Sequence, residues 1–283
     1  MRIVRTKAEL WEAVKCGRSN GETVALVPTM GNLHEGHLKL VEAGRKAANR
    51  TVVSIFVNPT QFGPNEDFDR YPRTEAEDVT KLEQAGVELL YLPTVAEMYG
   101  DRPKTVVSVK ELSVLYCGKF RPGHFDGVAT VVCKLLNQVQ PDFAFFGEKD
   151  KQQLTIIRKM VMDLDIPVEI KSVPTVRESD GLAMSSRNGY LSPEERRIAP
   201  KLYQALCHAR DEIEKGPKTY RQIEHETAES LRQSGFLPDY LAICRENDLL
   251  SASPDDNELV ILAAANLGKT RLIDNICFVK NTD

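Results

Sequence analysis

The 283-residue chain has a composition typical of a globular protein, with 42% hydrophobic and 28% charged residues, and its length suggests about two domains. A net charge of −4 argues against a nucleic-acid partner, and no apolar run approaches the roughly 18 residues that a membrane span needs. The six scattered cysteines form no Cys-x-x-Cys pair, and the N-terminus carries no signal-like apolar stretch. We therefore expect a cytoplasmic protein without a zinc site, a disulfide framework or a membrane partner.

Short apolar segments rich in β-branched residues alternate with helical patterns along the first part of the chain. We expect strands over residues 23–27, 51–57, 87–92, 143–146 and 168–173. A helix should follow the first strand, with Leu40, Ala43 and Ala47 along its apolar stripe, and further helices should cover residues 75–84, 128–138 and 152–163. This alternation predicts the α/β class, in which a parallel sheet carries helices on both faces.

The pattern changes after residue 175, where a polar and irregular stretch predicts a long loop. The loop should end at a helix that Ser192 caps, with Pro193 at the first helical position and Glu195 completing a capping box. A smaller α+β domain should follow, with helices over residues 198–215 and 222–233 and strands over residues 240–244, 259–264 and 270–277. The expected domains are residues 1–176 and 177–283.

The loop between the first strand and its helix has the sequence Val27-Pro-Thr-Met-Gly-Asn-Leu-His-Glu-Gly-His37. It leaves the carboxyl end of a strand, where open α/β sheets bind ligands, and it leads into a helix N-terminus, which attracts anions. His34 and His37 are three residues apart and can face one ligand, while Gly36 permits a close approach. The pattern predicts a phosphate site. One alternative is a pair of surface histidines at a helix start. Another is a zinc site, for which no third ligand is obvious nearby.

His34-Glu-Gly-His37 resembles the HIGH signature of class I aminoacyl-tRNA synthetases and related nucleotidylyltransferases, and Met184-Ser-Ser-Arg187 resembles their mobile KMSKS loop. Six blocks in order are similar to the pantothenate synthetase family: VPTMGNLHEGH, FVNPTQF, YPRT, RPGHFDGV, FGEKDKQQ and MSSRNGYL. The resemblance implies a Rossmann-like domain with a smaller C-terminal lid, commonly in a homodimer. It also implies that ATP and pantoate form pantoyl-adenylate, and that the amine of β-alanine then displaces AMP to give pantothenate.

The resemblance also implies roles for individual residues. Five residues are expected to stabilise charge during adenylation: His34, His37, Lys149, Ser185 and Arg187. Of these, His37 corresponds to the residue named as the family's proton donor. Residues expected to bind ATP are Pro28, Thr29, Met30, His34, Gly36, His37, Gly147, Lys149, Asp150, Val176, Met184, Ser185, Ser186 and Arg187. The expected substrate contacts are Gln61 and Gln153 for pantoate, Tyr71, Arg121 and His124 on the β-alanine side, and Met30 and Asn58 as further substrate-binding residues. ATP implies Mg²⁺, for which Asp78 is a candidate ligand, although its position favours an exposed helical acid.

Other classes share parts of this pattern. An adenylyltransferase of the same superfamily would keep the HIGH-like loop but not the NPTQF and FGEKDKQQ blocks, and an aminoacyl-tRNA synthetase would need an anticodon-binding domain. A non-catalytic nucleotide sensor would need the fold and the glycines, but not both histidines, Lys149 and the MSSR segment. Leu267-Gly-Lys-Thr270 resembles the end of a phosphate-binding P-loop, but Ala263 occupies the position of its first glycine, so we reject that reading.

Overall fold

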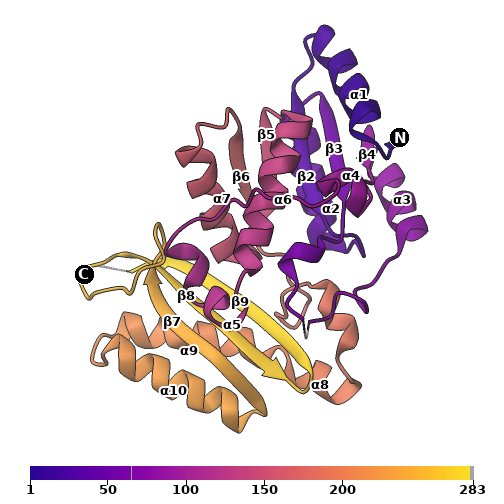
Figure 1. The fold of residues 1–283 in the computed structure, drawn as a ribbon. Coiled ribbons are helices and arrows are strands. Elements are labelled where there is room, and N and C mark those ends of the chain that lie inside the picture. Colours follow the sequence, from indigo (N-terminus) through magenta and orange to yellow (C-terminus); the bar gives the residue numbers. More distant parts are fainter. Residues whose placement is uncertain (65, 281–283) are drawn as a thin grey trace. The chain divides into compact units, whose positions relative to one another are not determined.

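The computed structural model describes residues 1–64 and 66–280, and its contacts divide the chain into two compact units (Figure 1). Unit 1 comprises residues 1–148 and 156–174, and unit 2 comprises residues 149–155 and those from 175 onward. The short segment 149–155 joins unit 2 through specific bonds. Asn275 Nδ2 donates to the carbonyl oxygen of Lys149 at 2.9 Å, and the buried Lys151 pairs with Glu246 at 2.7 Å. The sequence pattern assigns this segment to the first domain, because it cannot reveal such distant partners.

Unit 1 contains, within the described residues, a six-stranded parallel sheet in the order β1-β4-β3-β2-β5-β6. The strands are β1 (Arg2–Val4), β2 (Val24–Thr29), β3 (Arg50–Ile55), β4 (Leu89–Tyr91), β5 (Phe143–Gly147) and β6 (Glu169–Val173). The chain runs outward from β2 through β3 to β4 and then returns to the other side of β2 to form β5. Strands β2 and β5 therefore flank the topological switch point of the sheet, outside which open α/β proteins bind ligands.

Helices cover both faces of this sheet, which confirms the predicted α/β class. The helices between β1 and β6 are α1 (Lys7–Ser19), α2 (Glu35–Ala47), α3 (Glu75–Gln84), α4 (Val95–Tyr99), α5 (Cys117–Phe120), α6 (His124–Val139) and α7 (Lys151–Asp163). On one face, α2 and α3 share a buried apolar cluster with strand residues that include Val27 and Leu90. Strand alternation directs Tyr91 to the other face, where its hydroxyl donates to Gln138 Oε1 of α6 at 3.1 Å.

The apolar side of α2 differs from the prediction. Leu40 and Val41 are buried together with Gly44, whereas Ala47 is exposed. A Cβ added at Gly44 would lie 3.5 Å from three side chains of β2 and β3, which is ordinary contact distance. The glycine therefore belongs to the surface that packs on the sheet, which hydrophobicity alone does not indicate.

The first 19 residues form elements that the sequence pattern did not reveal. The short strand β1 pairs with β4, and α1 begins at a capping box made by Thr6 and Glu9. Leu10 and Val14 lie on the buried side of the helix. The Thr-x-x-Glu spacing was the available signal, because the apolar pattern of this segment is weak.

Unit 2 has, in the part of the chain that the structure describes, a three-stranded antiparallel sheet in the order β7-β8-β9. Its elements are α8 (Pro193–Ile198), α9 (Lys201–Lys215), α10 (Tyr220–Gln233), β7 (Phe236–Arg245), β8 (Glu258–Leu267) and β9 (Thr270–Val279). Helices α9 and α10 pack on the sheet through one apolar cluster, which confirms the smaller α+β fold. The predicted capping box of Ser192 and Glu195 starts α8, and the rejected P-loop sequence is the tight turn between β8 and β9.

The described residues contain neither a membrane-spanning helix nor a disulfide. Across residues 1–64 and 66–280, no helix has the length and apolar character needed to cross a membrane. The six cysteines all lie in these residues, and no disulfide joins them.

Candidate active site

Both histidines of the H-x-G-H motif take part in the start of α2. His34 is the N-cap, and its Nδ1 accepts a hydrogen bond from the backbone N–H of Gly36 at 3.2 Å. The Nδ1 atom of His37 accepts from the backbone N–H of His34 at 3.3 Å. The two ring centroids are 4.1 Å apart. The motif is therefore a capping box in which histidines replace the usual hydroxyl and carboxylate side chains.

These bonds determine the tautomer of both rings. A backbone N–H only donates, so Nδ1 of each imidazole is the acceptor, and each neutral ring carries its hydrogen on Nε2. His34 and His37 thus supply Nε2–H donors at a helix N-terminus, whose dipole also favours anions. This arrangement suits the oxygens of a phosphate chain.

The other predicted ATP residues of unit 1 lie at the ends of the two strands that flank the switch point. Pro28 and Thr29 end β2, and Met30 begins the loop. The Thr29 hydroxyl donates to the carbonyl oxygen of Ser54 at 2.9 Å, so it also ties β2 to β3. Gly147 ends β5, and a Cβ added there would meet no atom within 4 Å. Its backbone is therefore accessible to a ligand.

Asp78 differs from both predictions made for it. The residue is 0% exposed, because it lies on the buried side of α3. Its Oδ1 accepts from the backbone N–H of Leu33 at 2.7 Å, and its Oδ2 accepts from that of Asn32 at 2.8 Å. The expectation of an exposed acid is wrong, and Asp78 does not fit as a magnesium ligand, because both oxygens hold the β2–α2 loop. Within the described ranges there is no group of three or more His, Cys, Asp or Glu side chains suited to a metal ion.

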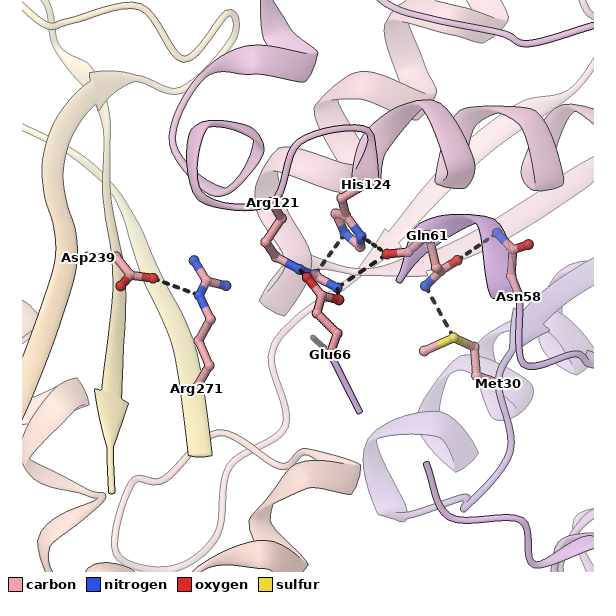
Figure 2. A network of polar contacts seen from close by, with 8 residues as sticks. All are labelled: Met30, Asn58, Gln61, Glu66, Arg121, His124, Asp239 and Arg271. Atoms are coloured by element: carbon pink, nitrogen blue, oxygen red, sulfur yellow. Dashed lines mark hydrogen bonds and ion pairs between the residues drawn. The ribbon is translucent and has the colours of Figure 1, made fainter. Parts of the chain in front are cut away.

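The side chain of Gln61 is held at the end of η1 (Pro59–Gln61) by two neighbours, as Figure 2 shows. Asn58 Nδ2 donates to Gln61 Oε1 at 3.1 Å, and Gln61 Nε2 donates to Met30 Sδ at 3.2 Å. Asn58 itself is 1% exposed, and its Oδ1 accepts from the Tyr99 hydroxyl at 2.7 Å. The buried amide of Asn58 therefore orients Gln61, and the predicted contact of Asn58 with a substrate stays a prediction.

A second set of contacts holds the backbone of Gln61 (Figure 2). His124 Nδ1 donates to the Gln61 carbonyl at 2.8 Å, so the neutral ring accepts at Nε2, where Arg121 donates at 3.0 Å. Arg121 also forms a bidentate ion pair with Glu66, in which Nε donates to Oε1 at 2.7 Å and Nη2 donates to Oε2 at 2.5 Å. Burial raises the pKa of the Glu66 carboxyl, but the hydrogen bonds and charge of Arg121 outweigh burial and hold this pKa below its ordinary value. The structure thus brings together three predicted substrate residues from separate sequence blocks.

Tyr71 is a buried packing residue. Its ring meets that of Phe62 edge to face, with centroids 5.9 Å apart, and Phe62 meets Phe68 in the same way at 5.4 Å. The Arg73 guanidinium lies over the Phe68 ring at 5.3 Å. This aromatic cluster stabilises the segment that carries Glu66, and the predicted contact of Tyr71 with β-alanine stays a prediction.

The MSSR segment of unit 2 is more ordered than the sequence suggested. Residues Val176 to Met184 form a small hairpin, in which the Met184 N–H donates to the Val176 carbonyl at 2.9 Å. Ser185 then caps the short helix η4 (Ser186–Tyr190), where its Oγ accepts from the Arg187 N–H at 3.3 Å. The prediction of a long irregular loop is therefore wrong for this stretch, because local hydrogen bonds organise it into a hairpin and a helical turn.

Ion pairs hold this hairpin within unit 2. Arg177 donates to both carboxylate oxygens of Asp274 at 2.7 and 2.9 Å, and the Asp274 side chain is only 3% exposed. Arg196 of α8 pairs with Glu178 at 2.8 Å and with Asp180 at 2.6 Å, at partly exposed positions. The hydrogen bond from Arg196 lowers the pKa of the Asp180 carboxyl below its ordinary value.

Three further predicted residues belong to the segment that joins unit 2. Lys149 and Asp150 lie in η3 (Glu148–Asp150), where Lys149 Nζ is 4.0 Å from Asp150 Oδ2. The Lys149 side chain is mostly buried, which limits its mobility. Gln153 follows in the first turn of α7 and is half-buried.

The family model for pantoate-beta-alanine ligase matches residues 2–277 of the chain. The chain belongs to this ligase family. A pantothenate synthetase of Methylococcus capsulatus is 55% identical over 284 residues, which cover 100% of this chain and 99% of the relative. A pantothenate synthetase of Alkalilimnicola ehrlichii is 53% identical over 285 residues, with 100% of both chains covered.

Solved structures of pantothenate synthetases share the fold of this ligase family member. A Thermus thermophilus pantothenate synthetase superposes with a TM-score of 0.92 at 49% identity, covering 98% of this chain and 99% of that one. A Francisella tularensis pantoate-beta-alanine ligase, complexed with beta-gamma ATP and beta-alanine, gives a TM-score of 0.82 at 33% identity. That comparison covers 100% of this chain and 99% of the Francisella chain.

Sequence reasoning missed several residues that hold the site of this ligase family member. Asp78 precedes the fully buried Leu82 by four positions, so helical spacing was a signal that it faces inward. Glu66 and Tyr99 carry no such signal, because their partners Arg121 and Asn58 lie 55 and 41 positions away in the chain.

Proposed function

We propose that this ligase family member condenses pantoate with β-alanine at the expense of ATP, giving pantothenate, AMP and diphosphate through a pantoyl-adenylate. The observation that carries the proposal is the pair of Nε2–H donors of His34 and His37, at the N-terminus of α2 and beside the switch point of the sheet. A phosphate chain placed there would meet both donors and the helix dipole. The family match over residues 2–277 and the Francisella ligase with its ATP and β-alanine ligands support the same reaction.

The chemistry accounts for the use of ATP. A carboxylate is a weak electrophile, so an amine does not displace its oxygen readily. In the first step, a carboxylate oxygen of pantoate attacks the α-phosphorus of ATP, and the bond to diphosphate breaks. In the second step, the β-alanine amine attacks the acyl carbon, loses a proton, and AMP leaves with the electron pair of the C–O bond. Positioning and stabilisation of charge at phosphorus dominate the first step.

We assign that stabilisation to five residues: His34, His37, Lys149, Ser185 and Arg187. The histidines donate through Nε2, Lys149 offers a compact positive charge, and Arg187 offers a planar fork for phosphate oxygens. The Ser185 hydroxyl, which accepts from the Arg187 N–H, retains its own hydrogen for donation. The further ATP contacts are assigned to Pro28, Thr29, Met30, Gly36, Gly147, Asp150, Val176, Met184 and Ser186.

Pantoate is assigned to Gln61 and Gln153, with Met30 beside Gln61. An amide both donates and accepts, which suits a ligand with hydroxyl groups and a carboxylate. Gln61 supports this assignment, because Asn58 and Met30 hold its amide in one orientation. A preorganised amide loses little entropy when the ligand binds.

β-Alanine is assigned to Arg121, His124 and Tyr71. A guanidinium recognises carboxylates through two parallel bonds, and the carboxylate of β-alanine would take the place that Glu66 holds on Arg121. The connection of Arg121 and His124 to the Gln61 carbonyl supports placing β-alanine beside Gln61.

Magnesium accompanies ATP in this proposal, through phosphate oxygens and water, and no residue of the chain is assigned to it. A homodimer, a cytoplasmic location, the absence of a nucleic-acid partner, and a lid role for residues 177–283 that carries the KMSKS-like segment stay predictions.

Exchange of labelled pyrophosphate into ATP tests the proposal. Exchange should require pantoate but not β-alanine, and the complete reaction should release AMP and diphosphate. Lactate, a smaller hydroxy acid, serves as the control substrate and should support little exchange. Exchange that depends on β-alanine would contradict a separate adenylation step, and the absence of AMP and diphosphate would indicate a nucleotide sensor.

A further inference from the structure

The loop that precedes His34 has an unusual backbone. Gly31 has a φ of +83° and Asn32 has a φ of +48°, so two successive residues adopt left-handed conformations. Glycine tolerates this region readily, whereas asparagine occupies it at some cost. Such a turn needs surrounding contacts to hold a single conformation.

Helix α3 supplies these contacts through two side chains. The carboxylate of Asp78 accepts from the backbone N–H groups of Asn32 and Leu33 at 2.8 and 2.7 Å. Lys81 Nζ donates to the Leu33 carbonyl at 2.6 Å. Thr74, before the first turn of α3, donates its hydroxyl to Asp78 Oδ2 at 3.1 Å and orients the carboxylate. We call Asp78 and Lys81 the α3 clamp.

The Asp78 carboxylate of the clamp contacts the loop backbone directly, in a buried position. A Cβ added at Gly31 would lie 3.1 Å from Asp78 Oδ2, so the carboxylate is seated directly against the backbone. Asp78 is fully buried, and Leu33 beside it is 2% exposed. A carboxylate at this position needs both of its N–H partners, because a buried charge without hydrogen bonds is costly.

The clamp ends where the histidine pair begins. Leu33, which both clamp residues bind, is followed immediately by His34, the N-cap of α2. The backbone N–H of His34 in turn donates to His37 Nδ1. A shift of the clamped loop would therefore move the N-cap and alter the bond that determines the tautomer of His37.

We propose that Asp78 and Lys81 are positioning residues for adenylation, which aim the Nε2–H donors of His34 and His37 at the phosphate chain. The inference rests on the proposed function of this site. Preorganised donors stabilise a transition state only when their geometry is held closely, so a small displacement lowers the rate more than it lowers nucleotide affinity. The clamp residues need not touch ATP to have this effect.

The test compares Asp78→Asn with Glu83→Gln, which removes a carboxylate from an exposed position of the same helix. The asparagine keeps the size of the side chain but presents an NH₂ group where one backbone N–H needs an acceptor. Pantoate-dependent pyrophosphate exchange should fall about tenfold to hundredfold in Asp78→Asn, with the dissociation constant for ATP within about threefold of the parent. Glu83→Gln should match the parent in both measurements.

A double-mutant cycle separates positioning from a general loss of structure. In a His37→Ala background, Asp78→Asn should cost less than about threefold, because the donor that it positions is absent. Lys81→Met, which keeps the apolar stem, should lower exchange in the same His37-dependent way if Asp78→Asn fails to fold. Amide hydrogen exchange at Asn32 and Leu33 should accelerate in both clamp variants, and this readout needs no enzymatic activity.

Either of two kinetic results would overturn the inference: an exchange rate in Asp78→Asn within twofold of the parent, or an equal fold-loss in the presence and absence of the His37 side chain. Unchanged amide protection at Asn32 and Leu33 would likewise reject the clamp. A parent protein that shows no pantoate-dependent exchange would instead contradict the proposed function, and the amide measurement would still decide whether α3 holds the loop.

Discussion

The two signature segments of the chain are held by different kinds of contact. In unit 1, the H-x-G-H segment is capped by its own histidines, and a buried carboxylate binds the preceding backbone through two N–H groups. In unit 2, the MSSR segment follows a hairpin that Arg177 ties to the buried Asp274, while Arg196 holds its tip through partly exposed ion pairs. The first segment is therefore anchored by buried and partly buried hydrogen bonds, and the hairpin before the second is tied by a buried ion pair at its base and by partly exposed ion pairs at its tip.

The two kinds of contact differ in how they can respond to a ligand. Buried hydrogen bonds to a charged group are strong and are screened little by salt, so the H-x-G-H segment should keep its geometry before and after ATP binds. Partly exposed ion pairs contribute little and are screened readily, so the tip of the hairpin that precedes the MSSR segment can exchange partners at low cost. One segment is suited to preorganised donors and the other to contacts that form on binding.

The largest effect should follow the loss of a preorganised donor. His37→Ala should lower the adenylation rate by about 10²–10³-fold, because one aimed donor at a developing charge contributes that much in comparable sites. Single-turnover formation of acyl-adenylate measures the rate, and His225→Ala, at an exposed histidine of α10, is the control. A loss of less than about tenfold would remove the distinction between a preorganised and an adaptable segment.

A smaller effect should follow the loss of a contact that forms on binding. Arg187→Ala should lower the single-turnover adenylation rate about tenfold to hundredfold, since a charged hydrogen bond to phosphate contributes about 1.5–3 kcal/mol. Arg197→Ala, at an exposed arginine of α8, should leave the rate unchanged. A rate within about twofold of the parent would refute a catalytic role for the MSSR segment, and a loss greater than that of His37→Ala would reverse the comparison.

The smallest effect should come from the partly exposed ion pairs of Arg196. Arg196→Met removes the pairs with Glu178 and Asp180, and we expect adenylation to change by no more than about threefold, because such pairs contribute little. Arg197→Met is the matched control. A tenfold loss, comparable to that expected for Asp78→Asn, would show that the tip is anchored as firmly as the unit 1 loop.

The same variant has a predicted pH dependence. The folded-state pKa of Asp180 lies below its unfolded value, so the stabilisation by Arg196 is present above the unfolded pKa and is lost as the pH falls through the folded value. The difference in melting temperature between the parent and Arg196→Met should therefore shrink at acid pH, below about pH 4. A difference that grows in acid would contradict the pairing.

The fold class and the position of the H-x-G-H motif at a helix N-terminus could be predicted from the sequence alone. Alternating apolar strands and helices specify a parallel sheet covered on both faces, because each element must bury one side. The position of His34 and His37 after β2 placed the motif at a helix N-terminus, and the Ser192–Glu195 capping box was readable from four consecutive residues. These features depend on neighbours within one or two helical turns, so a local pattern carries them.

The polar groups that hold the candidate site have partners in distant parts of the chain, which the sequence pattern does not reveal. Asp78 was expected to be exposed, but it binds backbone groups 45 and 46 positions earlier in the chain. Asn58 accepts from the hydroxyl of Tyr99, 41 positions later in the chain, and supports the amide of Gln61. The segment 149–155 joins unit 2 through Asn275 and Glu246. Each outcome depends on a partner that folding brings from a distant part of the chain, and hydrophobic periodicity contains no information about the identity of such a partner.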